Sequence, residues 1–207
     1  MRIGTMFAGR VDEIAGEAIE TKFFILGVPL FPLSTHYLTS TATRQGFEIP
    51  ISSKSVLLGY ARMGLWIGGL LWGVLGWVTK HYSDGPEVLV GPAILLAAAA
   101  FVTWGVGGVP KGQRPQRLVL KAITGLAADP VCLPQDLRSK IFERLTKSWE
   151  ERFPSRDWRQ AVEAPTLEPE QTPLLYALAS YASDRALSLR AWQRLASDDS
   201  SRGAPYR

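Results

Sequence analysis

Residues 63–79 read MGLWIGGLLWGVLGWVT and residues 88–109 read VLVGPAILLAAAAFVTWGVGGV, and neither stretch contains a charged side chain. The hydrocarbon core of a bilayer is about 30 Å thick, and roughly 20 apolar helical residues cross it. The two stretches therefore predict a transmembrane hairpin with spans at about 61–79 and 88–109. Two buried helices of a soluble core are the alternative, but a chain this small has little polar structure with which to cover helices that are apolar all round.

The composition outside these stretches excludes several classes of protein. The chain has 207 residues, of which 46% are hydrophobic and 20% charged, and its formal net charge is +4. Most of this positive excess follows residue 109, which argues against a general nucleic-acid binder, so we expect no nucleic-acid partner. The single cysteine, Cys132, excludes an intrachain disulfide framework and a zinc site built from several cysteines.

The basic residues beside the two stretches predict the orientation of the hairpin. Only Lys80 lies in the connecting loop, whereas the outer ends of the two spans carry several basic residues, namely Lys54, Arg62, Lys111, Arg114, Arg117 and Lys121. Positively charged loops tend to stay in the cytoplasm. We therefore expect a multi-pass protein of the bacterial inner membrane with both termini in the cytoplasm. The basic residues assigned to the membrane interface are Arg62, Lys111, Arg114, Arg117 and Lys121.

Glycines in the first stretch predict a helix-packing face. Gly64 precedes Gly68 by four residues, and Gly69 precedes Gly73 by four. Small residues at this spacing let two helix backbones approach closely in lipid. The partner is either the second span, through Ala93, Ala97 and Ala100, or a second copy of the chain, and we place packing against the second span first.

Residues 1–56 have the pattern of a small β module. Apolar residues alternate with others from Ile19 to Ile25, which is typical of a half-buried strand. Pro29 and Pro32 interrupt the pattern, and further strands are expected at 3–7, 33–39 and 47–51. The pattern predicts an antiparallel meander or a small barrel.

Residues 111–196 are predicted to be an α-helical module. Helices are expected at 134–152 and at 172–196, packed as a hairpin. Residues 114–123 read as an amphipathic helix, which either lies on the membrane surface or faces a protein core. Residues 197–207 are expected to be disordered. The predicted fold class is therefore an α+β membrane protein, with a two-helix transmembrane hairpin (57–110) between the β module and the helical module.

One segment resembles a known group of proteins. TKFFILGVPLFPLSTHYL (21–38), followed by SVLLGYARMGLW (55–66), is similar to uncharacterised bacterial membrane proteins with two spans and an N-terminal segment of the type TKFFxLxxPLxPL. The resemblance covers roughly residues 15–80. It implies the membrane topology, and it carries no activity or site with it.

No catalytic, metal-binding or cofactor-binding constellation stands out. Cys132 needs a nearby base to act as a nucleophile, and His36 is the candidate. His81, Asp84 and Glu87 share one short loop and make a poor metal site. Neither apolar stretch, 63–79 or 88–109, contains an ionisable group of the kind that an ion or proton pathway needs. We therefore expect no catalytic residue, no metal and no cofactor.

These observations predict a non-enzymatic membrane anchor or scaffold, which holds its two modules at the inner membrane. The expected partners are the lipid bilayer and either other proteins or further copies of the chain, bound through the first span. One alternative is a subunit of an oligomeric channel or export complex. Another is a membrane-bound cysteine hydrolase that uses Cys132 and His36.

Overall fold

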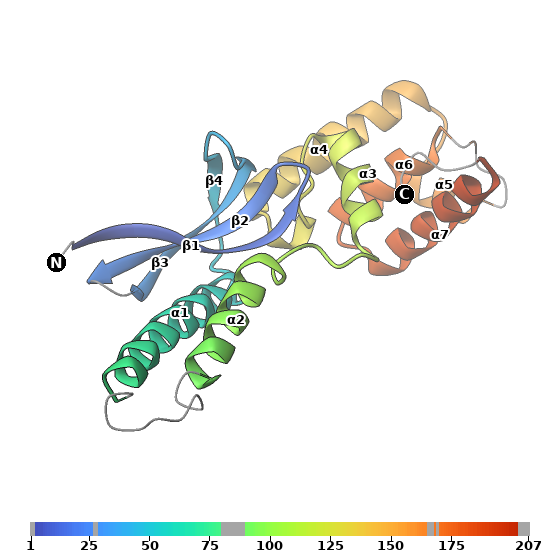
Figure 1. Cartoon of the computed structure of the whole chain (residues 1–207). Helices are drawn as coiled ribbons and strands as arrows, with labels where there is room; N and C mark the ends of the chain where they lie inside the picture. The colour runs from blue at the N-terminus through green and yellow to red at the C-terminus, as the bar shows by residue number, and fades with distance from the viewer. Residues whose placement is uncertain (1–2, 27–28, 80–89, 165–167, 169, 203–207) are drawn as a thin grey trace. The chain divides into compact units, whose positions relative to one another are not determined.

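The N-terminal part of the chain is a four-stranded antiparallel sheet (Figure 1). The computed structural model describes every residue except 1–2, 27–28, 80–89, 165–167, 169 and 203–207. The strands follow the order of the sequence and are β1 (Ile3–Ile14), β2 (Glu17–Leu26), β3 (Pro29–Ser40) and β4 (Gln45–Ile49). The meander predicted from the alternating pattern is confirmed, although β1 runs well beyond its predicted end at residue 7.

The first strand is bent where it meets the first helix. The register between β1 and β2 shifts twice, between Ala8 and Val11 and between Val11 and Ile14. Gly9 lies in the first of these bulges with φ +71°, a conformation that glycine adopts at little cost. A Cβ at Gly9 would lie 1.9 Å from the backbone oxygen of Ser55, so only glycine fits this position.

A long helix, α1 (Ser53–Thr79), begins directly against the sheet. Ser52 caps its first turn, because its Oγ accepts a hydrogen bond from the amide of Ser55 at 3.4 Å. On α1, Gly59 lies against the ring of Phe23, and that ring is completely buried. The N-terminal turns of α1 therefore share the core of the sheet.

A second apolar helix, α2 (Val90–Trp104), lies along α1, and the chain then returns to the sheet (Figure 1). The amide of Asp12 donates to the carbonyl of Gly107 at 2.5 Å, and Glu13 forms a β-bridge with Gly108. The sheet, α1 and α2 belong to one compact unit, Met1–Val109.

The predicted two-helix transmembrane hairpin is wrong. Among the described residues, α1 alone is both long and apolar enough to cross a membrane. Its 27 residues extend about 40 Å, whereas the 15 residues of α2 extend about 22 Å and fall short of a hydrocarbon core of about 30 Å. The second apolar stretch was read as helix up to residue 109, but α2 ends at Trp104, before a glycine-rich segment in which Gly107 has φ +126°. Residues 88 and 89 lie outside the described part.

The second compact unit, Pro110–Arg207, is helical. Its elements are α3 (Arg114–Thr124), the short 3-10 helix η2 (Pro130–Cys132), α4 (Gln135–Arg152), α5 (Trp158–Glu163), α6 (Thr172–Tyr181) and α7 (Arg185–Arg202). The core forms around α6, where Leu175 and Leu178 are completely buried, and α3, α4, α5 and α7 all contact α6. The helix expected at 134–152 is confirmed as α4, and Ile141, Leu145 and Trp149 are buried as its pattern indicates.

The single helix expected at 172–196 is two helices, because the chain turns at Ser183 with φ +60°. Asp184 then caps α7, since its Oδ1 accepts from the amides of Ala186 and Leu187 at 3.1 and 3.0 Å. The expectation of disorder from residue 197 is wrong up to Arg202, where α7 ends. Residues 203–207 lie outside the described part.

Candidate membrane-insertion surface

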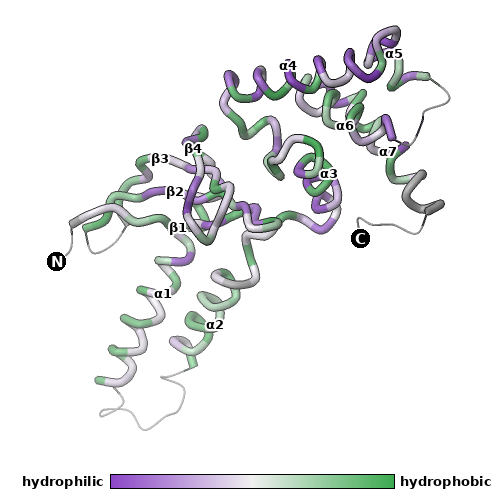
Figure 2. Tube along the Cα trace, turned by 90° about the horizontal axis from the view of Figure 1, so that it is seen from above, coloured by the Kyte–Doolittle hydropathy of each residue, from purple (hydrophilic) through white to green (hydrophobic). Residues whose placement is uncertain are grey.

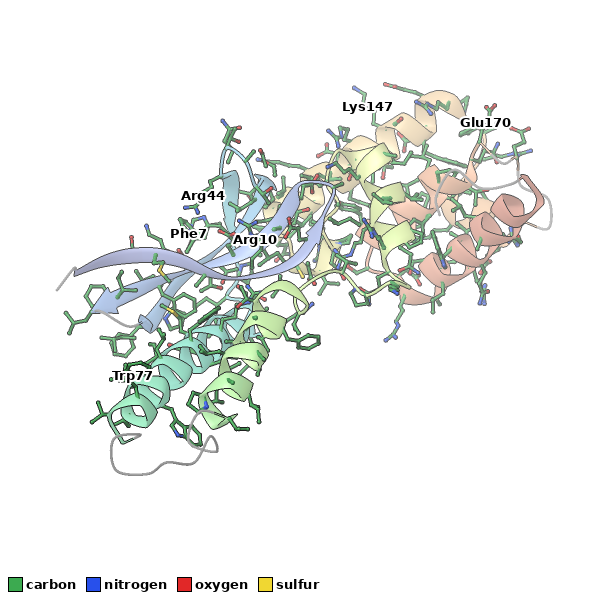
Figure 3. All side chains as sticks on the ribbon, viewed as in Figure 1. Phe7, Arg10, Arg44, Trp77, Lys147 and Glu170 are labelled. Carbon is green, nitrogen blue, oxygen red and sulfur yellow. The ribbon has the colours of Figure 1, made fainter. Side chains whose placement is uncertain are left out.

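The half of α1 that points away from the sheet exposes its apolar side chains. Trp72 and Trp77 are 52% and 68% exposed, and the aliphatic residues around them are also more than half exposed, namely Leu70, Leu71, Val74, Leu75 and Val78. Figure 2 shows the apolar character of α1 and α2, and Figure 3 places Trp77 near the end of α1 that is far from the sheet. Contiguous apolar surface of this kind marks a contact with a membrane or a protein.

The second helix adds apolar surface to the same unit. Val90, Ile94 and Phe101 of α2 are all more than half exposed. The two helices pack on each other, yet each keeps an exposed apolar side. Within the described residues of this unit, packing between α1 and α2 therefore leaves a large apolar area exposed.

The end of the β2–β3 hairpin is a third exposed apolar region. Leu26, Leu30, Phe31 and Leu33 are all exposed there, and no charged residue occurs between Lys22 and His36. The hydroxyl of Tyr60 donates to the carbonyl of Leu30 at 2.8 Å, so this hairpin end lies beside the first turns of α1. The sequence pattern does not predict this region, because Pro29 and Pro32 indicate only a break in a strand. We define the insertion surface as the exposed apolar residues of α1, of α2 and of this hairpin end.

Buried hydroxyl groups join α1 to the sheet. Ser55 of α1 donates to the carbonyl of Gly9 at 2.6 Å and accepts from Thr21 at 2.8 Å, and the hydroxyls of Thr21 and Thr35 lie 3.0 Å apart. Ser55, Thr21 and Thr35 are completely buried. Buried polar groups that satisfy one another specify one arrangement, because leaving any of them unpaired is costly. The angle between α1 and the sheet is therefore fixed.

Charged residues surround this junction. Arg10 of β1 donates to the buried carboxylate of Glu20 at 2.5 Å, and Lys54 pairs with Asp12 at 2.5 Å. Arg62 donates to the carbonyls of Val102 and Val106 at 3.2 and 2.7 Å, at the C-terminal end of α2. A cation is favoured at that end of a helix, so Arg62 joins the first half of α1 to the end of α2.

The four predicted packing glycines fall into two pairs. A Cβ at Gly69 would lie 2.9 Å from Leu96 Cδ2, and one at Gly73 would lie 3.8 Å from Pro92, so these two glycines face α2. A Cβ at Gly64 or Gly68 would meet nothing within 4 Å. The α2 residues in these contacts are Leu95, Leu96 and Pro92 and not the predicted alanines, of which Ala93 and Ala97 are exposed and Ala100 is half-buried.

Replacing Gly69 by leucine should separate α1 from α2. Overfilling a close contact costs about 1–3 kcal/mol, and the same change at Gly68 should leave the helix pair intact because that side is open. Thermal unfolding of the full chain in detergent, followed by tryptophan fluorescence, compares the two variants. Equal losses of stability in both would contradict the assignment of Gly69 to the helix contact.

The predicted basic interface residues have different surroundings. Arg62 lies at the sheet–helix junction described above. Lys111 and Arg114 are exposed and Lys121 is half-buried, all three in the helical unit. Arg117 is only 8% exposed and donates to Asp129 at 3.3 Å and to the carbonyl of Ala127 at 3.3 Å. Arg117 thus supports the fold of the helical unit.

The two candidate chemical residues belong to different compact units. His36 lies in β3, where its Nε2 is 2.9 Å from Ser34 Oγ and its ring meets Phe7 edge-on, while Cys132 is half-buried in η2 of the other unit. Within the described residues, no group of three or more His, Cys, Asp and Glu side chains is placed to hold a metal ion. His81, Asp84 and Glu87 lie outside the described residues.

Comparison of the chain with protein-family models, with curated proteins and with solved structures finds no match.

Proposed function

We propose that this protein is a non-enzymatic membrane anchor and scaffold. The observation that carries the proposal is the exposed apolar side of α1, the helix that is long and apolar enough to cross a membrane. In this proposal α1 inserts into the bilayer and holds the two compact units at the membrane.

Energetics support insertion of this surface. Burying apolar surface is worth about 25 cal/mol per Å², and fully burying one large apolar side chain is worth about 1.5–3 kcal/mol. The seven exposed apolar residues from Leu70 to Val78 would together contribute on the order of 10 kcal/mol when transferred into lipid. That is large enough to hold the chain at a membrane without a covalent lipid anchor.

The fixed junction supports a scaffolding role. Because the hydroxyls of Ser55, Thr21 and Thr35 bond to one another, α1 cannot turn freely against the sheet. A membrane helix joined rigidly to a sheet holds that sheet in one orientation above the bilayer. Lys54 and Arg62 lie in the half of α1 that adjoins the sheet. Because basic residues beside a span tend to stay in the cytoplasm, they support the proposal that the sheet lies at the cytoplasmic face of the bacterial inner membrane.

The helical unit offers a surface for a protein partner. A cavity of about 410 Å³ lies among α3, η2, α6 and α7, and its rim includes Val131, which is 74% exposed, and Leu189, which is 49% exposed. Tyr176 and Trp192 also line it. Burial raises the pKa of the Tyr176 hydroxyl, so at neutral pH this group is an uncharged hydrogen-bonding group. Aromatic residues beside exposed aliphatic ones are typical of protein interfaces.

Photo-crosslinking in native membranes tests the scaffold. A crosslinking amino acid at position 131 or 189 of the full chain should yield an adduct of one defined mass with another protein. The same amino acid at Lys147, which is exposed on α4 and labelled in Figure 3, should not. Identical patterns at all three positions, or no adduct at 131 and 189, would count against a partner-binding helical unit.

A subunit of an oligomeric membrane complex is the second candidate function. The open positions of Gly64 and Gly68 favour it, because a helix of another copy can approach closely there. The Gly68→Leu variant that serves above as a control should then change the oligomeric state while leaving the fold intact. Crosslinking of native membranes that gives only a monomer for the unaltered chain would remove this candidate.

A further inference from the structure

Three arginines line one cavity at the junction between the sheet and α1. The cavity has a volume of about 280 Å³, and its charged lining residues are Arg10 of β1, Arg44 of the β3–β4 turn, Arg62 of α1 and a single carboxylate, Glu20. Figure 3 shows Arg10 and Arg44 beside Phe7, which also lines the cavity. A second carboxylate, Glu13, lies 4.0 Å from Arg10 outside this lining. Three arginines against two carboxylates leave a net positive site, which favours an anionic ligand.

The arginines differ in how they are held. Arg10 is fixed by its 2.5 Å bond to Glu20, which is only 4% exposed, and Arg62 is fixed by the carbonyls of Val102 and Val106. Arg44 is exposed, and within the described part of the chain its guanidinium has neither a hydrogen bond nor an ion pair. Two guanidinium groups are thus held in place while a third is available to close on a ligand.

Each guanidinium carries five N–H donors. The bond to Glu20 uses one donor of Arg10, and the bonds to Val102 and Val106 use two donors of Arg62. Planar guanidinium groups suit the oxygens of a phosphate, to which they bind in pairs of hydrogen bonds. Like charges that share one site repel each other, and an anion in the cavity would relieve that repulsion.

Apart from Thr103, the remaining lining residues are apolar or glycine, and those on α1 adjoin the insertion surface. Met63 and Trp66 belong to the turns of α1 that precede its exposed apolar half, and the indole of Trp66 donates to Thr103 of α2 at 3.2 Å. A second cavity of about 480 Å³ shares Arg10, Arg62 and Thr103 with the first. The site therefore combines cationic and apolar groups, with Arg10 beside Phe7 on the sheet and Arg62 beside Met63 and Trp66 on α1.

We propose that this cavity binds the phosphate headgroup of an anionic phospholipid, with Arg10, Arg44 and Arg62 as its ligands. The inference rests on the proposed insertion of α1, because insertion brings the cavity to the level at which headgroups lie. An amphiphile matches a site whose lining is both cationic and apolar, whereas a free phosphate ion matches only the cationic groups.

The test uses the full chain in mild detergent, with native mass spectrometry of the lipids that remain bound. Phosphatidylglycerol and phosphatidylcholine are offered in equal amounts, and the unaltered chain should retain phosphatidylglycerol preferentially. Arg44→Gln should reduce that preference about fivefold, since one basic residue near the surface is worth about 1 kcal/mol. Arg114→Gln, which removes an exposed arginine outside the cavity, should leave it unchanged.

Competition with inorganic phosphate and flotation with neutral vesicles complete the test. Equal retention of the two lipids, or an equal effect of Arg44→Gln and Arg114→Gln, would overturn the inference. Displacement of the lipid by millimolar inorganic phosphate would overturn it in favour of a free-phosphate site. Flotation with neutral vesicles separates the two proposals. If the chain floats but does not prefer phosphatidylglycerol, only the headgroup site is refuted. If the chain does not float, the proposed membrane anchor is refuted as well.

Discussion

Gly9→Ala should destabilise the N-terminal unit by about 3 kcal/mol. The substitution places a Cβ 1.9 Å from the carbonyl oxygen of Ser55, and it forces alanine to adopt φ +71°, which costs about 1–2 kcal/mol. The first turn of α1 must then move away from β1. The buried hydrogen bonds of Ser55 to Gly9 and Thr21 are weakened, each worth about 0.5–1.5 kcal/mol.

Thermal unfolding of the full chain in detergent, followed by circular dichroism, measures this loss. A change of about 3 kcal/mol in a unit of this size lowers its Tm by on the order of 15 °C. Gly4→Ala is the matched control in the same strand, because a Cβ at Gly4 would meet nothing within 4 Å. If Gly9→Ala had the same Tm as Gly4→Ala and the unaltered chain, the close contact between β1 and α1 would be refuted.

Replacing Leu70 and Val74 by lysine should release the protein from membranes. Both side chains are about 60% exposed on α1, so the substitutions leave the packed core untouched. At the centre of a membrane helix, each exchange of an aliphatic residue for lysine costs about 3 kcal/mol. Two exchanges amount to about 6 kcal/mol, which lowers membrane partitioning by on the order of 10⁴-fold.

Fractionation of cell membranes, with immunodetection of the chain in pellet and supernatant, measures the release. Leu57→Lys is the control, since Leu57 is 71% exposed on the same helix but precedes Arg62, in the part that adjoins the sheet. The control should stay in the pellet. A double variant that also stayed in the pellet would show that the exposed side of α1 does not hold the chain at the membrane.

Local patterns predicted much of the fold. The alternation in β2 predicted a strand, and the spacing of Ile141, Leu145 and Trp149 predicted α4, because both patterns report which side chains face a core. The break at Ser183 has a local signal as well, since Asp184 is a favoured residue for capping the start of a helix. The apolar pattern continues across it, however, and that pattern indicates a single helix.

Three features that the sequence does not predict depend on contacts between residues far apart in the chain. α2 ends at Trp104, and Arg62, far away in the sequence, binds the carbonyls at that end. The arginine cavity unites residues from β1, the β3–β4 turn and α1, and no spacing within one segment indicates such a group. The need for glycine at position 9 likewise comes from Ser55 and not from the neighbours of Gly9 in the chain.

The central claim is that the insertion surface places α1 in a lipid bilayer. Alkaline carbonate extraction of membranes that contain the unaltered full chain, followed by flotation of the extracted material, tests it most directly. If α1 lies in the bilayer, we expect the chain to resist extraction and to float with the lipid. Release of the chain into the supernatant as a monodisperse protein that needs no detergent would contradict it.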